Sequence, residues 1–274
     1  MMNSMPFSVS MCVYEKDSPV WFEEALESVI NQTVKPDEII LVVDGPITIE
    51  LENIVSEYEN KNLIKVIRLP QNMGHGIARR TGLENCTHEL VALMDSDDIC
   101  AENRFEKQLN LFKECPELSI VGGNIEEFVG SLGCVAGRRI VPQKDEQIKL
   151  YLKKRCPFNQ VTVMFKKTDV ESVGGYLDWY CNEDYYLWVR MYLADFKFAN
   201  IDDILVHVRV GKDMYKRRGG WRYFKSEYLL QKFMLQKRII GISTFGMNVG
   251  KRLIVQVLLP DSIRGYVFKK FARS

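Results

Sequence analysis

The chain is poor in the residues from which zinc centres and disulfide frameworks are built. It contains three histidines and seven cysteines among 274 residues, and no two cysteines lie closer than 14 positions. Because no CxxC pair is present, a structural zinc site is not expected. An odd number of scattered cysteines is typical of a reducing compartment, so we expect a cytoplasmic protein.

Long apolar runs are also lacking. The nearest candidate, residues 239–259, is interrupted by Lys251 and Arg252, so no transmembrane helix is predicted. The first 13 residues have neither a basic segment nor a long apolar core, and a secretory signal peptide is therefore not expected.

The composition is that of a globular protein, with 46% apolar and 27% charged residues. The length corresponds to one large domain or to a domain with an appendage. The net charge of +1 conceals an asymmetry, because residues 207–274 carry 16 basic and three acidic residues and the rest of the chain has a net charge of −12. The C-terminal part is therefore expected to favour anionic surfaces.

Strand-like and helix-like segments alternate over the first 123 residues. Apolar runs typical of strands lie at 7–13, 38–43, 63–69, 90–94 and 118–122. Helical spacing and the Ser18-Pro19 start signal predict helices after residue 18 and at 49–58, 76–84 and 101–115. This alternation indicates an α/β fold with a mostly parallel, doubly wound sheet.

The rhythm changes after Gly123. A loop at 130–139 precedes expected helices at 145–155 and 184–193, a strand at 161–165, a short helix ending at Gly174-Gly175 and a strand pair within 198–210. Beyond residue 220 only helices are expected, at 221–239, 245–258 and 261–271.

One buried strand ends in a run of acids. Residues 90–94 lead directly into Asp95-Ser96-Asp97-Asp98, at the strand end where open α/β sheets place ligands. Crowded carboxylates repel one another, and a divalent cation such as Mg²⁺ or Mn²⁺ holding a diphosphate would neutralise them. Alternatively, Asp97 and Asp98 cap the following helix and Asp95 belongs to a turn.

Two further polar loops follow strands of the same expected sheet. Tyr14-Glu15-Lys16-Asp17 follows the first strand and Asp44-Gly45-Pro46 the second, so both would lie at the edge that carries the acidic run. Tyr14 could stack on a flat base, and Asp44 could accept a hydrogen bond from a ring N–H or a ribose hydroxyl. Each residue alone fits an ordinary turn better, and their shared edge is what favours one joint site.

A glycine-bearing loop, residues 72–82, opens the helix expected at 76–84. Such a loop presents backbone N–H groups and a helix N-terminus to an anion, with Arg79 or Arg80 as a charged partner. Its glycines do not have GxGxxG spacing, and it follows the third strand instead of the first. A Rossmann dehydrogenase is therefore not expected.

Two adjacent acids, Glu183 and Asp184, begin the apolar helix at 184–193. Acids stabilise helix N-termini by about 0.3–1 kcal/mol, which explains them without a functional role. Alternatively, Asp184 is a general base beside a low-dielectric aromatic wall that includes Trp179 and Trp188. Aromatic faces beside a carboxylate also suit a sugar ring.

Together these motifs resemble those of family 2 glycosyltransferases, the inverting group with a GT-A fold and a DxD motif. The run at 95–98 matches the DxDD motif, the loop at 72–79 matches the N-x-G…A-R-N-x-G motif, and Glu183-Asp184 matches the ED pair. The resemblance covers residues 7–210, with departures at Arg80, where the family usually has Asn, and at Gln160, where relatives often have His. Segments 156–160, 209–211 and 217–220 further resemble the transferases that build bacterial O-antigen, capsule or exopolysaccharide repeat units.

The resemblance implies a division of the chain and a role for individual residues. A catalytic domain would span residues 1–220, with a nucleotide-binding half at 1–123 and an acceptor half at 124–220, followed by a basic helical region at 221–274. A UDP-sugar would contact seven residues of the first half: Tyr14, Glu15, Asp44, Gly74, Arg79, Asp95 and Ser96. Asp97 would ligate Mn²⁺ or Mg²⁺, with His207 as a further metal ligand and Arg209 as a phosphate contact.

On the acceptor side, the resemblance implies that Glu183 and Trp188 contact the acceptor. Asp184 would remove the proton from its attacking hydroxyl. A single displacement of UDP would invert the anomeric carbon and give a β-glycoside. The expected reaction moves a hexose, glucose or galactose, to a sugar linked to undecaprenyl diphosphate.

The basic tail suits the inner face of an anionic membrane, where such an acceptor would lie, so peripheral membrane association is expected. Alternatively, the tail caps the catalytic domain or forms an oligomer interface. No nucleic-acid partner is expected. Two other functions are considered: a sugar nucleotidyltransferase, whose glycine-rich loop after the first strand is lacking here, and a non-catalytic binding subunit, against which the intact Asp95, Asp97 and Asp184 argue.

Overall fold

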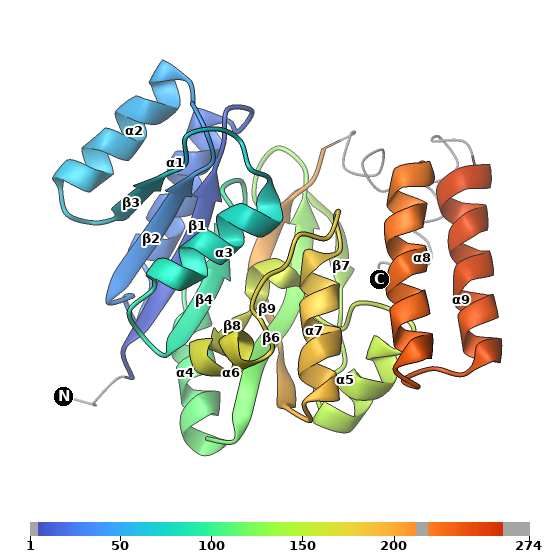
Figure 1. Cartoon of the computed structure of the whole chain (residues 1–274). Coiled ribbons are helices and arrows are strands. Elements are labelled where there is room, and N and C mark those ends of the chain that lie inside the picture. The colour runs from blue at the N-terminus through green and yellow to red at the C-terminus, as the bar shows by residue number, and fades with distance from the viewer. Residues whose placement is uncertain (1–4, 212–218, 260–274) are drawn as a thin grey trace.

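The computed structural model describes residues 5–211 and 219–259 (Figure 1). Strands and helices alternate in the first half, as expected: β1 (Phe7–Val13), α1 (Pro19–Ile30), β2 (Glu38–Val43), α2 (Ile49–Asn60), β3 (Lys65–Arg68), α3 (His75–Asn85), β4 (Leu90–Met94), β5 (Ile99–Cys100), α4 (Arg104–Glu114) and β6 (Leu118–Phe128). The bounds of β1, β2 and β4 agree with the sequence prediction, whereas the two-residue strand β5 is not predicted.

The second half contains β7 (Val135–Arg139), α5 (Asp145–Leu152), β8 (Met164–Lys166), α6 (Lys167–Ser172), α7 (Glu183–Leu193), β9 (Lys197–Arg209), α8 (Trp221–Gln236) and α9 (Ile242–Leu253). Two predictions are wrong here. The loop expected at 130–139 contains β7, because this segment pairs with the end of β6. The strand pair expected within 198–210 is the single strand β9, because the long strand β6 supplies its partner. The helix expected at 261–271 lies outside the described residues.

The described strands form one sheet in the order β3-β2-β1-β4-β8-β6-β9-β5, with β7 paired to β6. Pairing is parallel from β3 to β4 and between β6 and β9, and antiparallel where β5, β7 and β8 join. The α/β prediction is confirmed. The purely parallel part is the first half, so the loops after β1, β2 and β4 lie at one edge of the sheet.

Alternating residues of each strand supply two hydrophobic cores, one on each face of the sheet. Leu41 and Ala92 face the core formed with α1, α2 and α4, whereas Ile40 and Val91 face the core formed with α3, α5, α6 and α7. Helix α8 joins the second core through Leu230 and Met234, both fully buried. Helix α8 therefore packs on the same core as α5, α6 and α7.

Helices α8 and α9 lie side by side at one end of the molecule (Figure 1). They run in opposite directions, so the N-terminus of α8 and the C-terminus of α9 lie at the same end of the pair. In residues 5–211 and 219–259, no helix has the length and apolarity needed to span a bilayer.

Candidate active site

A cavity of about 1630 Å³ opens at the edge where the parallel strands end. It is lined by loops that follow β1, β2 and β4, by the start of α3, by the start of α7, and by parts of α8 and α9. The structure brings ten of the predicted site residues to this cavity: Tyr14, Asp44, Gly74, Arg79, Asp95, Ser96, Asp97, Glu183, Asp184 and Arg209.

Asp44 fixes the glycine-bearing loop. Its Oδ1 accepts from the Met73 N–H at 2.7 Å and its Oδ2 accepts from the Gly74 N–H at 3.1 Å. Gly45 has a φ of +86°, and a Cβ there would lie 2.5 Å from the Asn72 nitrogen, so only glycine permits this approach. Both carboxylate oxygens of Asp44 thus already hold the loop, and each retains a lone pair toward the cavity.

Of the two adjacent arginines of α3, Arg79 is buried and Arg80 is exposed. The Nη2 of Arg79 lies 2.8 Å from Asp95 Oδ1, and its Nε is buried and has no hydrogen-bond partner in the part of the chain that the structure describes. Helix α3 reaches this position because Gly82 lies against Ser10 of β1, where a Cβ would be 2.2 Å from Oγ. The neighbouring Arg80 points to the surface and pairs with Glu84.

The acidic run joins two loops at the sheet edge. Ser96 Oγ donates to Asp17 Oδ2 at 2.8 Å, and the same carboxylate oxygen accepts from the Tyr14 N–H. Asp98 is buried and accepts from the Arg209 N–H at 2.8 Å. Burial, with repulsion from Asp97 and Asp95, raises the pKa of Asp98 well above its usual value.

The acid cluster has the chemistry of a divalent-cation site shared with a substrate. Asp95, Asp97 and Asp98 bring three carboxyl groups to the cavity, and burial, followed by repulsion from the other two carboxylates, raises the pKa of Asp98. Among the described residues, no group of three His, Cys, Asp or Glu side chains could hold a metal by itself. An Mg²⁺-like ion bound by one or two carboxylates and completed by phosphate oxygens fits both observations.

Asp184 lines the same cavity from the first turn of α7. Burial and the neighbouring Glu183 raise the pKa of Asp184 to about 6. Its Oδ1 accepts from the Tyr185 N–H at 2.6 Å, and Cys156 Sγ lies 3.8 Å from Oδ2. Burial raises the pKa of Cys156, so the thiol stays protonated and can donate to the carboxylate.

Glu183 differs from its neighbour. Burial raises the pKa of Glu183, but contact with His75 and the charge of Arg79 outweigh burial and leave this pKa lowered. The Nδ1 of His75 lies 3.6 Å from Glu183 Oε1. The pKa of Asp184 is thus raised and that of the adjacent Glu183 is lowered. Such a difference suits Asp184 to accept a proton and Glu183 to remain charged.

Three predicted site residues do not line the cavity: Glu15, Trp188 and His207. Glu15 is exposed. Trp188 is fully buried against Phe158 and Phe165, because it lies one helical turn beyond Asp184 and so deeper in the core. The Nδ1 of His207 faces Glu126 at 3.4 Å.

Arg209 reaches the cavity rim but has several protein contacts. Its Nε donates to the Asp97 carbonyl at 3.1 Å, its Nη1 donates to the Gly130 carbonyl, and its Nη2 pairs with Glu24. A phosphate contact would require the guanidinium to exchange some of these partners. The structure thus places Arg209 as a brace between β9 and the acidic run.

Sequence reasoning missed two residues that organise the site. Asp17 links the loops after β1 and β4, and only its neighbour Tyr14 had a distinctive signal. Arg139 donates to the Cys156 and Phe158 carbonyls at 2.6 and 3.1 Å, which holds the segment beside Asp184. No local pattern indicates Arg139, because it lies in the unpredicted strand β7.

Comparisons with known proteins place this geometry in context. A family described as "Glycosyl transferase family 2" matches residues 8–170. An "Uncharacterized glycosyltransferase" of Haemophilus influenzae is 41% identical over 276 residues, which cover 98% of this chain and 100% of that protein. The "UDP-Gal:alpha-D-GlcNAc-diphosphoundecaprenol beta-1,3-galactosyltransferase" of Escherichia coli is 40% identical over 267 residues, covering 97% of this chain and 96% of its own length.

A solved structure supports the fold. The structure of S. aureus TarS 1–349 in complex with UDP-GlcNAc superposes with a TM-score of 0.67 at 18% identity, and the match covers 91% of this chain and 73% of the other. At this identity the similarity shows the shared GT-A fold and nothing finer.

Proposed function

The chain belongs to glycosyl transferase family 2, and from this we propose that it transfers a hexose from a UDP-sugar to a sugar carried on undecaprenyl diphosphate. The product would be a β-glycoside in the assembly of a surface-polysaccharide repeat unit. Galactose is the favoured hexose and GlcNAc the favoured acceptor sugar, because the Escherichia coli relative at 40% identity is described with both.

The donor would lie across the ends of β1, β2 and β4. We define the donor end of the cavity as Tyr14, Asp44, Arg79, Asp95 and Asp97. Tyr14 and Asp44 would hold the base, Asp95 the ribose, and Arg79 the base or the diphosphate. The place of Arg79 in the cavity lining supports this assignment, because its guanidinium is held by Asp95 and can donate charge-assisted hydrogen bonds to a diphosphate.

Asp97 would hold Mn²⁺ or Mg²⁺ together with the diphosphate oxygens. When bound, such an ion stabilises the negative charge that develops on the leaving UDP. Among this chain's own residues, Asp95 and Arg79 would orient the nucleotide, and Asp44 would keep the loop at Met73 and Gly74 in place beside it.

The single observation that carries the proposal is Asp184. A carboxylate in the same cavity as the acidic run, with a pKa of about 6, is ionised at neutral pH yet basic enough to accept a proton from a hydroxyl. Attack by that hydroxyl on the face of the sugar opposite UDP inverts the anomeric carbon in one step. No covalent enzyme intermediate is needed.

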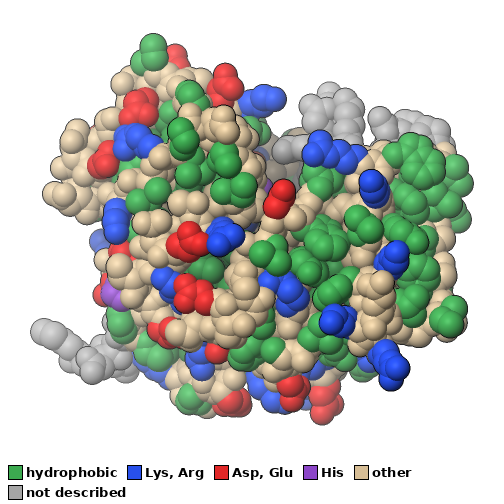
Figure 2. Space-filling model, in the orientation of Figure 1, with side chains coloured by type: hydrophobic (Ala, Val, Ile, Leu, Met, Phe, Trp, Pro, Cys, Tyr) green, Lys and Arg blue, Asp and Glu red, His purple; other side chains and the backbone are tan. Residues whose placement is uncertain are grey.

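The outer face of the helical region supports a location at the inner membrane surface. On the face shown in Figure 2, hydrophobic side chains gather over α8 and α9, with Lys and Arg rather than Asp and Glu among them. Trp221 and Ile242 are 67% and 81% exposed. Exposed apolar residues beside cations suit an anionic membrane surface.

The proposal is tested with UDP-galactose or UDP-glucose and a GlcNAc-diphosphate-lipid acceptor, with the product identified by mass spectrometry. We expect transfer that requires Mn²⁺ or Mg²⁺ and is abolished in Asp97→Ala. The control Asp203→Ala removes an exposed acid paired with Lys107, outside the cavity, and should retain activity. Transfer at full rate in EDTA would contradict the metal assignment, and formation of a UDP-sugar from UTP would indicate a nucleotidyltransferase instead.

A further inference from the structure

One part of the cavity carries the opposite charge to the acidic run. The end of β7, the segment after α5, the start of α8 and the end of α9 bring six cations to its lining: Arg139, Lys154, Arg155, Arg222, Lys251 and Arg252. The one acid that lines the cavity from these segments, among the residues that the structure describes, is Glu227, and it pairs with Arg252 at 2.6 Å.

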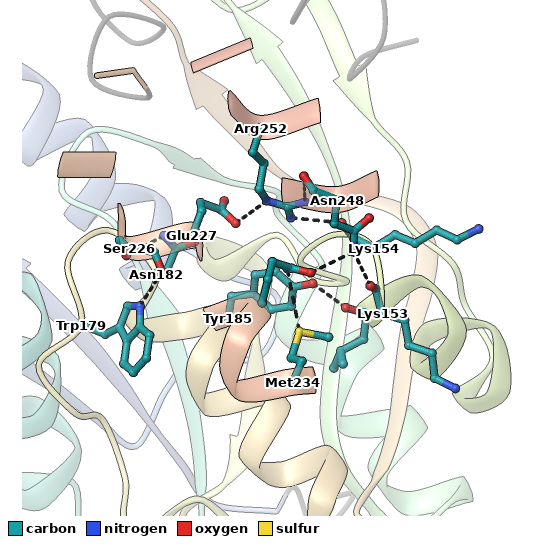
Figure 3. Close-up of polar contacts among 12 residues, drawn as sticks. Lys153, Lys154, Trp179, Asn182, Tyr185, Ser226, Glu227, Met234, Asn248 and Arg252 are labelled. Atoms are coloured by element: carbon teal, nitrogen blue, oxygen red, sulfur yellow. Dashed lines mark hydrogen bonds and ion pairs between the residues drawn. The ribbon is translucent and has the colours of Figure 1, made fainter. Parts of the chain in front are cut away.

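Two of the six cations hold the protein together. Arg139 donates to the carbonyls around residue 156, as described above, and Arg252 donates to the Asn248 and Lys154 carbonyls at 3.3 and 3.1 Å. Figure 3 shows Arg252 between Glu227 and the chain at Lys154. This one guanidinium therefore links α9 to α8 and both helices to the end of α5.

The remaining cations include three exposed side chains on the segments that Arg252 joins. Lys154 follows α5, Lys251 lies in the last turn of α9, and Arg222 lies in the first turn of α8. The guanidinium of Arg222 stacks at 4.0 Å from the ring centre of Tyr180, which also lines the cavity. We call Lys154, Arg222 and Lys251 the cationic wall.

Helix stability does not explain the position of Arg222. The N-terminus of a helix carries a partial positive charge, so a cation in the first turn is unfavourable and an acid or a capping side chain is favourable. The first turn of α8 contains no acid, and its N-cap residue Gly220 offers no side-chain hydrogen bond. By contrast, Lys251 at the C-terminal end of α9 is explained by the helix dipole alone.

The start of α8 therefore combines a helix N-terminus and an arginine, has no acid on that turn, and lines the same cavity as Lys154 and Lys251. An anion would be bound by the charges of these side chains, in the positive potential at the helix N-terminus. Phosphate oxygens suit an arginine and a helix N-terminus better than a carboxylate does, because they accept several charge-assisted hydrogen bonds at once.

We propose that the cationic wall binds the diphosphate of the lipid-linked acceptor. The inference rests on the proposed function for the identity of the acceptor. It places the two diphosphates of the reaction in different parts of one cavity, the donor's at the acidic run and the acceptor's at the start of α8. Glu183 and Asp184 line the cavity as well, so the acceptor sugar attached to the second diphosphate would meet the proton acceptor there.

Binding without catalysis provides the first test. Geranyl diphosphate is titrated into the full chain by calorimetry, with EDTA present so that no metal ion bridges it to the acidic run. We expect the Arg222→Ala/Lys251→Ala variant to bind about tenfold or more weakly, because each charge-assisted hydrogen bond to phosphate contributes strongly. Lys232→Ala, which removes an exposed cation of α8 outside the cavity, should bind like the wild type.

Transfer provides the second test. We compare kcat/KM for two acceptors of equal chain length, a GlcNAc-diphosphate-lipid and a GlcNAc alkyl glycoside. In the double variant, the ratio of the first value to the second should fall about tenfold, because only the first acceptor has a diphosphate that pairs with the cations. Arg222 and Lys251 are exposed, so both changes should leave the thermal midpoint unaltered. Rescue by Arg222→Lys would be partial, because lysine retains the charge but not the fork of donors.

The outcomes are separable. Equal binding of geranyl diphosphate by the wild type and the double variant would overturn the proposal. The proposal would also be overturned if the double variant bound geranyl diphosphate like the wild type but no longer bound phosphatidylglycerol vesicles. The cationic wall would then contact lipid headgroups instead of the acceptor diphosphate. If no sugar is transferred to any acceptor, the proposed function fails, and the calorimetric comparison still decides whether the wall binds a diphosphate.

Discussion

The donor end and the cationic wall belong to one cavity but are held together in different ways. At the donor end, short contacts join loops that follow neighbouring parallel strands, as in the pairs Asp44–Gly74 and Arg79–Asp95. At the cationic wall, α9 donates from Asn248 and Arg252 to carbonyls 95 and 98 residues earlier in the chain. Sheet topology assembles the first region, and docking of two helices assembles the second.

The largest expected effect concerns Asp184, which lines the cavity but belongs to neither region. Asp184→Asn should reduce kcat about 10³-fold, because a positioned general base contributes roughly 10²- to 10⁴-fold. The affinity for the UDP-sugar should stay within about twofold of the wild-type value, because this carboxylate is not expected to contact the bound donor. Rapid-quench kinetics measures the first quantity and calorimetry with the donor the second. The control Asp203→Asn changes an exposed acid outside the cavity, and a kcat near wild type in Asp184→Asn would remove the base assignment.

The next effect concerns the donor end. Arg79→Met removes the buried partner of Asp95 and should raise the KM for the UDP-sugar about 10- to 100-fold, because charged hydrogen bonds contribute about 1.5–3 kcal/mol. The KM for the acceptor should change little. The adjacent residue offers a matched control: Arg80→Met breaks only a surface pair with Glu84, so its donor KM should match that of the wild type. Equal effects of the two variants would show that Arg79 does not contact the donor.

A weaker effect is expected where the helices dock. Glu227→Ala leaves the guanidinium of Arg252 without its carboxylate, and both side chains are at most 14% exposed. Breaking such a pair costs about 3–5 kcal/mol, which should appear as a lower urea midpoint. The acceptor KM should rise about tenfold or less while the donor KM is unchanged, because the cationic wall loosens and the sheet edge does not. Glu227→Gln keeps a hydrogen-bond acceptor for Arg252 Nε, so its urea midpoint should fall less than that of Glu227→Ala. If Glu227→Ala raised the donor KM as much as the acceptor KM, the two regions would be coupled.

The same difference in assembly explains what the sequence predicts and what it does not. The acidic run at 95–98 can be read directly, because β4 is a short apolar run and the edge at which it ends is fixed by the α/β alternation. Asp44 and Arg79 follow from the same rule. The structure confirms the α/β class and brings all three to one cavity.

The second half is less readable because its contacts are not local. Strand β7 forms only because β6 is long enough to pair with it, and β9 is one strand because β6 runs beside it. Trp188 shares a helical face with Asp184, but periodicity does not reveal that Phe158 and Phe165 cover it. That Lys154, Arg222 and Lys251 line one cavity depends on a buried ion pair between two helices, for which the sequence carries no spacing rule.

The smallest effect concerns the contribution of Asp184, the proposed base, to stability. Since the folded-state pKa of Asp184, about 6, lies above the value near 3.9 of an unfolded aspartate, the folded state holds the extra proton between these pH values. Stability is therefore lost as pH rises through this window, and above it the buried charge destabilises the fold. Asp184→Asn removes that charge, so its thermal midpoint at pH 7.5 should exceed that of the wild type by about 5 °C, and the difference should vanish near pH 4. Calorimetric scans at both pH values measure this. If Asp184→Asn were less stable than the wild type at pH 7.5, the surroundings would stabilise the ionised carboxylate of Asp184. The buried charge would then not destabilise the fold.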